Sequence, residues 1–205
     1  MHTAKRLAPY RRKRDFAVTP EPADVPASPR GARGAAFVVH LHHARARHFD
    51  FRLELEGTLR SWAIPKGPSL DPAAKRLAVQ VEDHPLAYAR FEGRIPAGEY
   101  GAGKVWIWDR GTWTAPGNAA QALQKGQLRF TLRGQRLRGE WSLVRTRFAG
   151  RQPQWLLIKV ADAAARAGDV ADDVPLSRWR KRRGAAPVGR PHKAVRARAE
   201  AQARG

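Results

Sequence analysis

The sequence of 205 residues contains no cysteine and only one methionine, and no apolar run in it is long enough to span a membrane. The lack of cysteine excludes disulfide frameworks and cysteine-ligated zinc or iron–sulfur sites, so any metal ion must be held by His, Asp or Glu. The first residues also lack the apolar stretch of a signal peptide. We therefore expect a cytoplasmic protein with one buried core and no membrane partner.

Acidic residues are scarce as well. There are 39 Lys and Arg but only 18 Asp and Glu, so the formal net charge is 39 − 18 = +21. Phosphates neutralise such a surface best, so nucleic acid is the expected partner and the nucleoid the expected location. Residues 177–205 alone hold ten basic side chains and one acidic side chain. We expect a loop-like N-terminal arm over 1–34, one domain over 35–162, and a basic, largely disordered tail over 163–205.

Apolar and polar residues alternate through most of the central domain, and Gly and Pro interrupt the pattern repeatedly. This period of two predicts short antiparallel strands. The expected strands are 37–42, 48–55, 60–64, 76–83, 104–109, 127–133, 137–144 and 155–160. A sheet of that size avoids exposed edges by closing on itself, so the predicted fold is all-β, a compact antiparallel β-barrel of about eight strands. Asn118 is expected to cap a short helix over 119–125, and a further helical turn is expected near 83–93.

Two imidazoles and a carboxylate are expected to converge on one face of the first two strands. Side chains two apart on a strand point to the same side, so His48 and Asp50 share a polar row, and His42 holds the matching place on the preceding strand. The short connection over 43–47 predicts a hairpin that brings the three together. Such a trio can bind a divalent metal ion. Solvated surface histidines are the alternative, and His40 and His43 are weaker ligand candidates.

Cationic side chains recur near the proposed metal ligands. On the strand over 76–83, the alternation is expected to place Arg76, Glu82 and His84 on one face, toward the histidines. With Arg52 and Lys66 they would form a phosphate-ester site, in which cations neutralise the phosphate oxygens and His84 exchanges a proton. The glycine-rich segment 95–103 lacks the Gly-Lys-Ser/Thr ending of a nucleotide-binding loop, so we interpret it as a turn.

Five runs of residues together resemble the 3′-phosphoesterase module of bacterial DNA ligase D, over roughly residues 12–160. They are Arg14-Asp15-Phe16 with Thr19-Pro20-Glu21-Pro22, His42 to Glu54, Trp62-Ala63-Ile64-Pro65-Lys66-Gly67, Lys75 to Tyr88, and Tyr100-Gly101-Ala102-Gly103 with Trp108-Asp109. The resemblance implies a compact barrel with its active site on the outer surface. It also implies a manganese-dependent activity that removes a 3′-terminal ribonucleoside and then the 3′-phosphate, leaving a 3′-OH.

The resemblance further implies roles for individual residues. The metal ligands of that family correspond to His42, His48 and Asp50. Its phosphate-binding and catalytic side chains correspond to Arg52, Lys66, Arg76, His84 and Tyr88, with Glu82 supporting them. Its essential N-terminal trio corresponds to Arg14, Asp15 and Glu21. Phe49 and Ala97 depart from the residues usual in the family, and the chain resembles a free-standing version of the module.

The sequence therefore predicts a Mn²⁺-dependent 3′-end-healing enzyme in DNA break repair, although the ligand set also accepts other divalent ions. The expected substrates are DNA or RNA–DNA 3′ ends, bound by a monomer. The end-binding protein Ku and a separate DNA ligase stay open as partners. Basic tail residues are expected to add phosphate contacts: Arg178, Arg180, Lys181, Arg182 and Arg183. Two alternatives are a non-catalytic nucleic-acid-binding repair module and a general metal-dependent nuclease.

Overall fold

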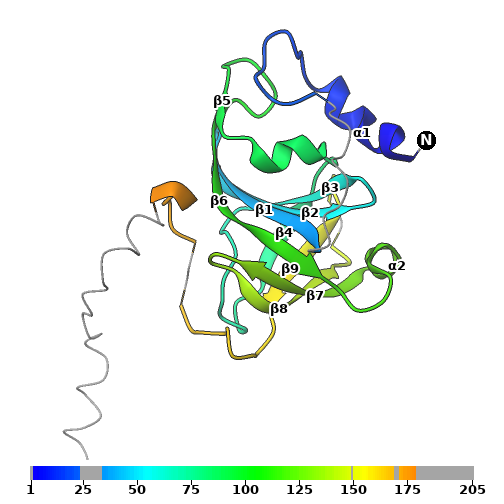
Figure 1. Cartoon of the computed structure of the whole chain (residues 1–205), viewed down its shortest axis with the longest axis vertical. Coiled ribbons are helices and arrows are strands. Elements are labelled where there is room, and N and C mark those ends of the chain that lie inside the picture. The colour runs from blue at the N-terminus through cyan, green and yellow to red at the C-terminus, as the bar shows by residue number, and fades with distance from the viewer. Residues whose placement is uncertain (1, 24–33, 149, 169–170, 179–205) are drawn as a thin grey trace, which may run out of the picture.

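The computed structural model describes residues 2–23, 34–148, 150–168 and 171–178, and Figure 1 shows the strands wrapped around one core. The strands are β1 (Ala35–His43), β2 (Arg47–Leu55), β3 (Thr58–Ile64), β4 (Arg76–Gln80), β5 (Gly93–Ile95), β6 (Gly103–Thr114), β7 (Gln127–Gly134), β8 (Arg138–Arg145) and β9 (Gln154–Lys159). The antiparallel order β1-β2-β3-β4-β9-β8-β7-β6 closes because β6 also pairs with β1, and β5 extends the sheet beside β6. The predicted eight-stranded antiparallel β-barrel is confirmed.

Strand alternation sorts β1 and β2 into an apolar and a polar face, as expected. Phe37, Val39 and Leu41 of β1 lie in the barrel core with Phe49 and Phe51 of β2. The residues between them point outward. The outer face is nevertheless buried, because the N-terminal arm, a 3-10 helix and a loop cover it. Within the described residues, no helix is both long and apolar enough to cross a membrane.

The face predicted for the strand beginning at Arg76 is wrong. Ala78 is fully buried in the barrel core, and Gln80 accepts a hydrogen bond from the buried indole of Trp155 at 3.0 Å. Leu77, on the other face, is 41% exposed. Both faces of β4 carry aliphatic side chains, so alternation could not tell them apart. β4 ends at Gln80, but the chain stays hydrogen-bonded to β3, because the Val81 N–H donates to the Ser61 carbonyl at 3.0 Å and His84 bridges to Leu59. The register shifts by one residue between the pair Trp62–Gln80 and the pair Leu59–His84.

Short helices cover parts of the barrel. The predicted helix is α2 (Ala119–Lys125), and the Asn118 side chain caps it by accepting from the backbone N–H of Gln121. The expected helical turn is the 3-10 helix η1 (Leu86–Arg90). The loop-like form expected for the first residues is wrong, because α1 (His2–Arg12) is helical. Its Leu7 and Tyr10 are buried. The segment has only these two buried apolar residues among many charged ones and has Pro9 inside it, so its sequence shows no clear helical periodicity.

The described residues beyond 162 pack against the barrel, although the predicted boundary places them in the tail. The indole N–H of Trp108 donates to the Asp172 carbonyl at 2.9 Å, and Arg136 pairs with the Asp172 carboxylate at 2.6 Å. Leu176 is buried against Val38 and Ile107. Arg178 is exposed. The other basic tail candidates lie outside the described residues: Arg180, Lys181, Arg182 and Arg183.

Candidate metal and phosphate site

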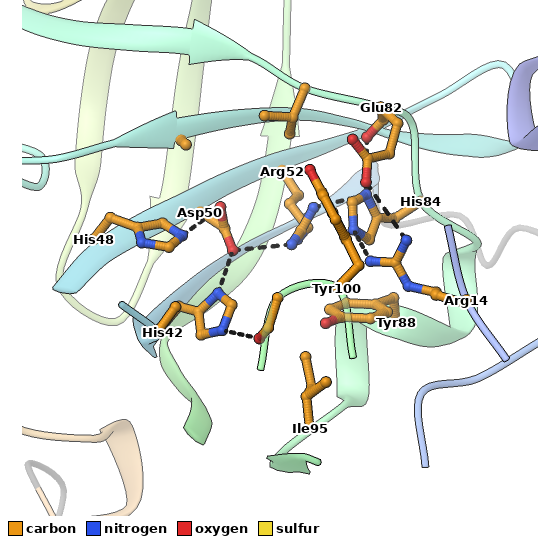
Figure 2. A pocket seen from close by; sticks show the side chains of 14 residues that line it. Arg14, His42, His48, Asp50, Arg52, Glu82, His84, Tyr88, Ile95 and Tyr100 are labelled. Carbon is orange, nitrogen blue, oxygen red and sulfur yellow. Dashed lines mark hydrogen bonds and ion pairs between the residues drawn. The ribbon is translucent and has the colours of Figure 1, made fainter. Parts of the chain in front are cut away.

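A small cavity opens on the outer face of β1, β2 and β3, where the arm, η1 and the loop before β6 meet (Figure 2). Its volume is about 150 Å³, less than that of a typical small-molecule pocket. The cavity therefore suits a phosphate-sized group better than a whole nucleotide. Its lining consists of Arg14, His42, Ala44, His48, Asp50, Arg52, Ala63, Val81, Glu82, His84, Tyr88, Ile95, Tyr100 and Gly101.

The predicted metal trio comes together at one end of this cavity. His42 and His48 are paired directly across the β1–β2 hairpin, and their ring centroids lie 4.8 Å apart. The Nδ1 of His42 lies 3.6 Å from one Asp50 oxygen, and the Nε2 of His48 lies 3.6 Å from the other. Ligand atoms of all three side chains lie within 4.8 Å of one another. This spacing allows one ion to reach all three.

Backbone carbonyls fix both imidazoles in the form that a metal ion needs. The Nε2 of His42 lies 2.8 Å from the Gly101 carbonyl, and the Nδ1 of His48 lies 2.9 Å from the Ala46 carbonyl. A carbonyl oxygen only accepts, so each of these nitrogens carries the proton. The opposite nitrogens, which face Asp50, keep their lone pairs. Such hydrogen bonds from the far side of the ring are usual for histidines that bind metals, so the donor set fits a divalent ion.

Asp50 is held as a carboxylate. Burial alone would raise its pKa, but the Arg52 guanidinium beside it outweighs burial and keeps the pKa well below its usual range. Arg52 donates from Nη2 to Asp50 at 3.1 Å and from Nη1 to the Ser61 hydroxyl at 2.8 Å. Its Nε lies 3.3 Å from Nδ1 of His40, whose pKa burial lowers to about 3. One guanidinium therefore positions the acidic ligand and leaves the neighbouring imidazole neutral.

His84 is a neutral imidazole between two guanidinium groups. Its Nδ1 lies 2.9 Å from Nη1 of Arg52, and its Nε2 lies 3.5 Å from Nη2 of Arg14. Burial first, and then these two cations, hold the pKa of His84 well below its ordinary value. A neutral ring in this place can accept a proton or a hydrogen bond.

The N-terminal arm adds a second layer of charges. Arg14 donates from Nε to Glu21 at 2.9 Å, and both side chains are almost fully buried. The Tyr88 hydroxyl also donates to Glu21, at 3.0 Å, and Glu82 lies 3.5 Å from Nη1 of Arg14. The structure thus brings four of the predicted residues together. Asp15 stays apart, since its carboxylate caps a turn by accepting from the Ala17 N–H.

Comparison with known proteins shows to which family this chain belongs. The family model described as the DNA Ligase D 3′-phosphoesterase domain matches residues 40–145. The chain belongs to this family. It is 54% identical over 172 residues to the multifunctional non-homologous end joining protein LigD of Pseudomonas aeruginosa, a match that covers 84% of this chain and 20% of the relative. It is 48% identical over 143 residues to the multifunctional non-homologous end joining DNA repair protein LigD of Mycobacterium tuberculosis, covering 70% and 19%.

The chain spans about a fifth of the length of these curated relatives. The segment that matches the 3′-phosphoesterase domain contains the metal trio together with Arg52 and His84. The arm with Arg14 and Glu21 lies before that segment. The structure therefore adds to the matched domain a set of buried charges that come from outside it.

Two of the phosphate-binding residues predicted beside the metal trio do not line the cavity. Lys66 is exposed and follows the end of β3. Arg76 begins β4 on the face that carries Ala78, which is buried in the barrel core, whereas the cavity lies on the outer face. Two further residues contribute although spacing pointed to no role for them: Ser61, which accepts from Arg52, and Tyr100, which lines the cavity. His40, a weaker ligand candidate because it shares the parity of His42, contacts Arg52 instead.

Proposed function

We propose that this chain is a Mn²⁺-dependent phosphoesterase that heals DNA 3′ ends in break repair. It would remove a 3′-terminal ribonucleoside and then the remaining 3′-phosphate, leaving a 3′-OH. The observation that carries the proposal is the trio of His42, His48 and Asp50, whose lone pairs face one point beside the cations of a phosphate-sized cavity. Membership of the 3′-phosphoesterase family supports it.

The metal ion belongs at the trio. When bound there, Mn²⁺ supplies a Lewis acid that polarises a phosphoryl oxygen of the ester. Imidazole and carboxylate donors also accept related divalent ions, so the choice of manganese rests on the resemblance. Asp50 contributes the negative charge of the ligand set, and Arg52 holds that carboxylate in place.

The remaining cavity residues would bind the phosphate and handle the proton. Arg52 and Arg14 converge on the cavity and would neutralise the non-bridging oxygens as charge develops. The neutral ring of His84 would use its Nε2 to contact the phosphate or to exchange a proton with the reacting oxygen. Tyr88 orients Glu21, which in turn holds Arg14. The family resemblance alone supports a catalytic role for Lys66, Arg76 and Asp15.

The test is an incubation of the purified chain and Mn²⁺ with a primer–template that ends in a 3′-phosphate. We expect conversion to a 3′-OH, seen as a mobility shift and confirmed by extension with a polymerase. A second primer that ends in a ribonucleoside should pass through the 3′-phosphate to the same product. Unchanged primers, with Mn²⁺ bound normally, would contradict the proposal. A non-catalytic module would instead keep full DNA affinity and show no turnover, and a general nuclease would also cut a circular substrate.

Electrostatic attraction would bring the chain to its proposed substrate. The surplus of 21 positive charges favours sequence-independent contacts with phosphates, and Arg178 would begin the tail contribution that continues through Arg180, Lys181, Arg182 and Arg183. DNA affinity should therefore fall as salt rises, and less steeply once residues 179–205 are removed. Such binding would place the chain on the nucleoid. The proposed binding form is a monomer, and Ku and a DNA ligase are open as partners.

A further inference from the structure

Tyr100 is an exposed aromatic side chain at the edge of a cavity whose other aromatic residue is buried. It is 48% exposed, whereas Tyr88 is 2% exposed and donates its hydroxyl to Glu21. Figure 2 shows Tyr100 and Ile95 at the cavity, where Ile95 ends β5 and Tyr100 lies in the loop that follows. The cavity is also lined by the cations Arg14 and Arg52, and the Arg14 guanidinium lies 5.7 Å from the Tyr100 ring centroid. The cavity thus combines cationic groups with one exposed aromatic ring.

The loop that carries Tyr100 is fixed to a metal ligand. The carbonyl of the next residue, Gly101, accepts from His42 at 2.8 Å. Gly98 and Gly101 have φ values of +93° and +80°, which glycine adopts without strain. The Ala102 N–H donates to the Glu99 carbonyl at 3.0 Å and closes a turn around Tyr100. The ring is therefore presented at a defined place relative to the metal trio.

The arm contacts Tyr100 without covering it. Lys13 reaches the Tyr100 hydroxyl at 3.2 Å, and its Nζ lies 4.4 Å from the ring centroid. The same ammonium pairs with Glu82 at 2.9 Å. Nearly half of the Tyr100 surface stays exposed despite this contact. A flat apolar group bound at the cavity can still stack on the ring.

We infer that Tyr100 forms a subsite for the nucleobase of the 3′-terminal nucleoside, beside the phosphate-sized cavity. This inference rests on the proposed function. The cavity takes a phosphate, so a nucleoside attached to that phosphate must lie at its mouth, where Tyr100 is exposed. Stacking on an aromatic ring accepts any base, because every base has a π face. The subsite would serve the removal of a nucleoside and would be empty when the end is a bare phosphate.

The experiment compares the full chain and its Tyr100→Ala variant, with Mn²⁺, on two primer–templates of one sequence. One primer ends in a ribonucleoside and the other in a 3′-phosphate. We expect Tyr100→Ala to lower kcat/KM for the ribonucleoside end about 5- to 150-fold more than for the 3′-phosphate end, the equivalent of the ~1–3 kcal/mol of stacking one base. Tyr100→Phe keeps the ring and should stay close to wild type. Phe148→Ala removes an exposed aromatic that does not line the cavity, and should match wild type on both ends.

A third primer, ending in a ribose without a base, sharpens the result. The wild-type preference for the complete ribonucleoside over this abasic end should disappear in Tyr100→Ala. Equal losses on all ends would overturn the inference, because they would mean that Tyr100 acts through Gly101 on His42. A Tyr100→Phe variant as damaged as Tyr100→Ala would overturn it too, because the Lys13 contact would then be the cause.

Equilibrium binding separates this inference from the proposed function. If wild-type protein turns over neither end, the proposed function fails, and fluorescence anisotropy without added metal still compares the complete and abasic primers. A preference for the complete primer that is lost in Tyr100→Ala supports the subsite. Wild-type protein that binds both primers equally contradicts it.

Discussion

Arg52 and Lys159 are both buried cations of the barrel, but their partners differ. The Nζ of Lys159 donates to the carbonyls of Glu140 and Val160 and to the Asp162 carboxylate, which gives each of its three N–H groups an acceptor. Arg52 donates to Asp50 and Ser61 beside the cavity and also contacts two imidazoles. Burial of a charge therefore does not identify a functional site. The partners of the charge identify the site. Arg52 donates to Asp50 of the predicted metal trio, whereas the partners of Lys159 join β8 to the end of β9.

The largest effect is expected from removing a proposed metal ligand close to Arg52. We expect His48→Ala to lower kcat/KM on a 3′-phosphate primer by about 10³-fold, since several kcal/mol of charge stabilisation are lost with the ion. His43→Ala is the matched control, because that histidine is exposed and has the opposite parity on β1. Calorimetry with Mn²⁺ should show weaker binding for His48→Ala alone. Full activity in His48→Ala would contradict the assignment of the trio.

Lys159 should matter for folding and not for chemistry. Lys159→Met preserves most of the side-chain volume but leaves the Asp162 carboxylate and the Glu140 carbonyl without this donor. Lys159 is fully buried but Asp162 is 23% exposed, so we expect the loss of this donor to cost about 1–3 kcal/mol of the free energy of unfolding. Urea denaturation measures the loss, and kcat/KM per folded molecule should match wild type. A variant that keeps its stability but loses activity would reverse the roles given to the two cations.

The neutral state of His84 links the site to stability through pH. The unfolded histidine titrates near pH 6.5, whereas the pKa of folded His84 lies well below that value, so the unfolded chain binds more protons. The free energy of unfolding should therefore fall as pH drops below about 6.5, by up to ~1.4 kcal/mol per pH unit from this residue.

The measurement is urea denaturation of metal-free protein at pH 7.5, 6.5 and 5.5. His84→Asn lacks this contribution, so the stability of the variant should decline less steeply toward low pH. His40, which is also buried and neutral, keeps its own contribution in both proteins and serves as an internal reference. Parallel declines would show that His84 is protonated in the folded chain.

The smallest effect is expected from an ion pair on the β7–β8 hairpin, which lies next to the strand that carries Lys159. Arg129 of β7 and Glu140 of β8 lie 2.8 Å apart, but their side chains are 62% and 46% exposed. Exposed pairs contribute about 0.2–1 kcal/mol because water screens them and because two long side chains must be ordered. Arg129→Ala should therefore change the urea midpoint only slightly. A loss as large as that of Lys159→Met would mean that burial is not what separates strong from weak pairs here.

Sequence reasoning succeeded where the residues that matter are near each other along the chain. The phenylalanines of β2 alternate with charged residues, so only one assignment of its buried and outer faces was consistent. The short connection to β1 then predicted a hairpin. The place of His42 opposite His48 followed from these two facts. The closed barrel followed from the number and spacing of the alternating segments.

Sequence reasoning failed where a contact joins distant segments or where a pattern is ambiguous. β4 carries aliphatic residues on both faces, so nothing local oriented Arg76. Leu7 and Tyr10 anchor α1 only because the barrel offers them a surface, and Tyr10 packs against His84 with ring centroids 4.9 Å apart. The packing of Leu176 depends on Val38 and Ile107 in the same way. Such contacts become visible only once the strands are arranged in space.

The two carbonyls that orient His42 and His48 differ greatly in their distance along the sequence from the histidine that they contact. The Ala46 carbonyl is two residues from His48, whereas the Gly101 carbonyl is 59 residues from His42. An isolated β1–β2 hairpin could satisfy the first contact but never the second. The chain should therefore bind a metal ion with high affinity only late in folding, after the loop before β6 has docked. The affinity for the ion would then report how completely the chain has folded.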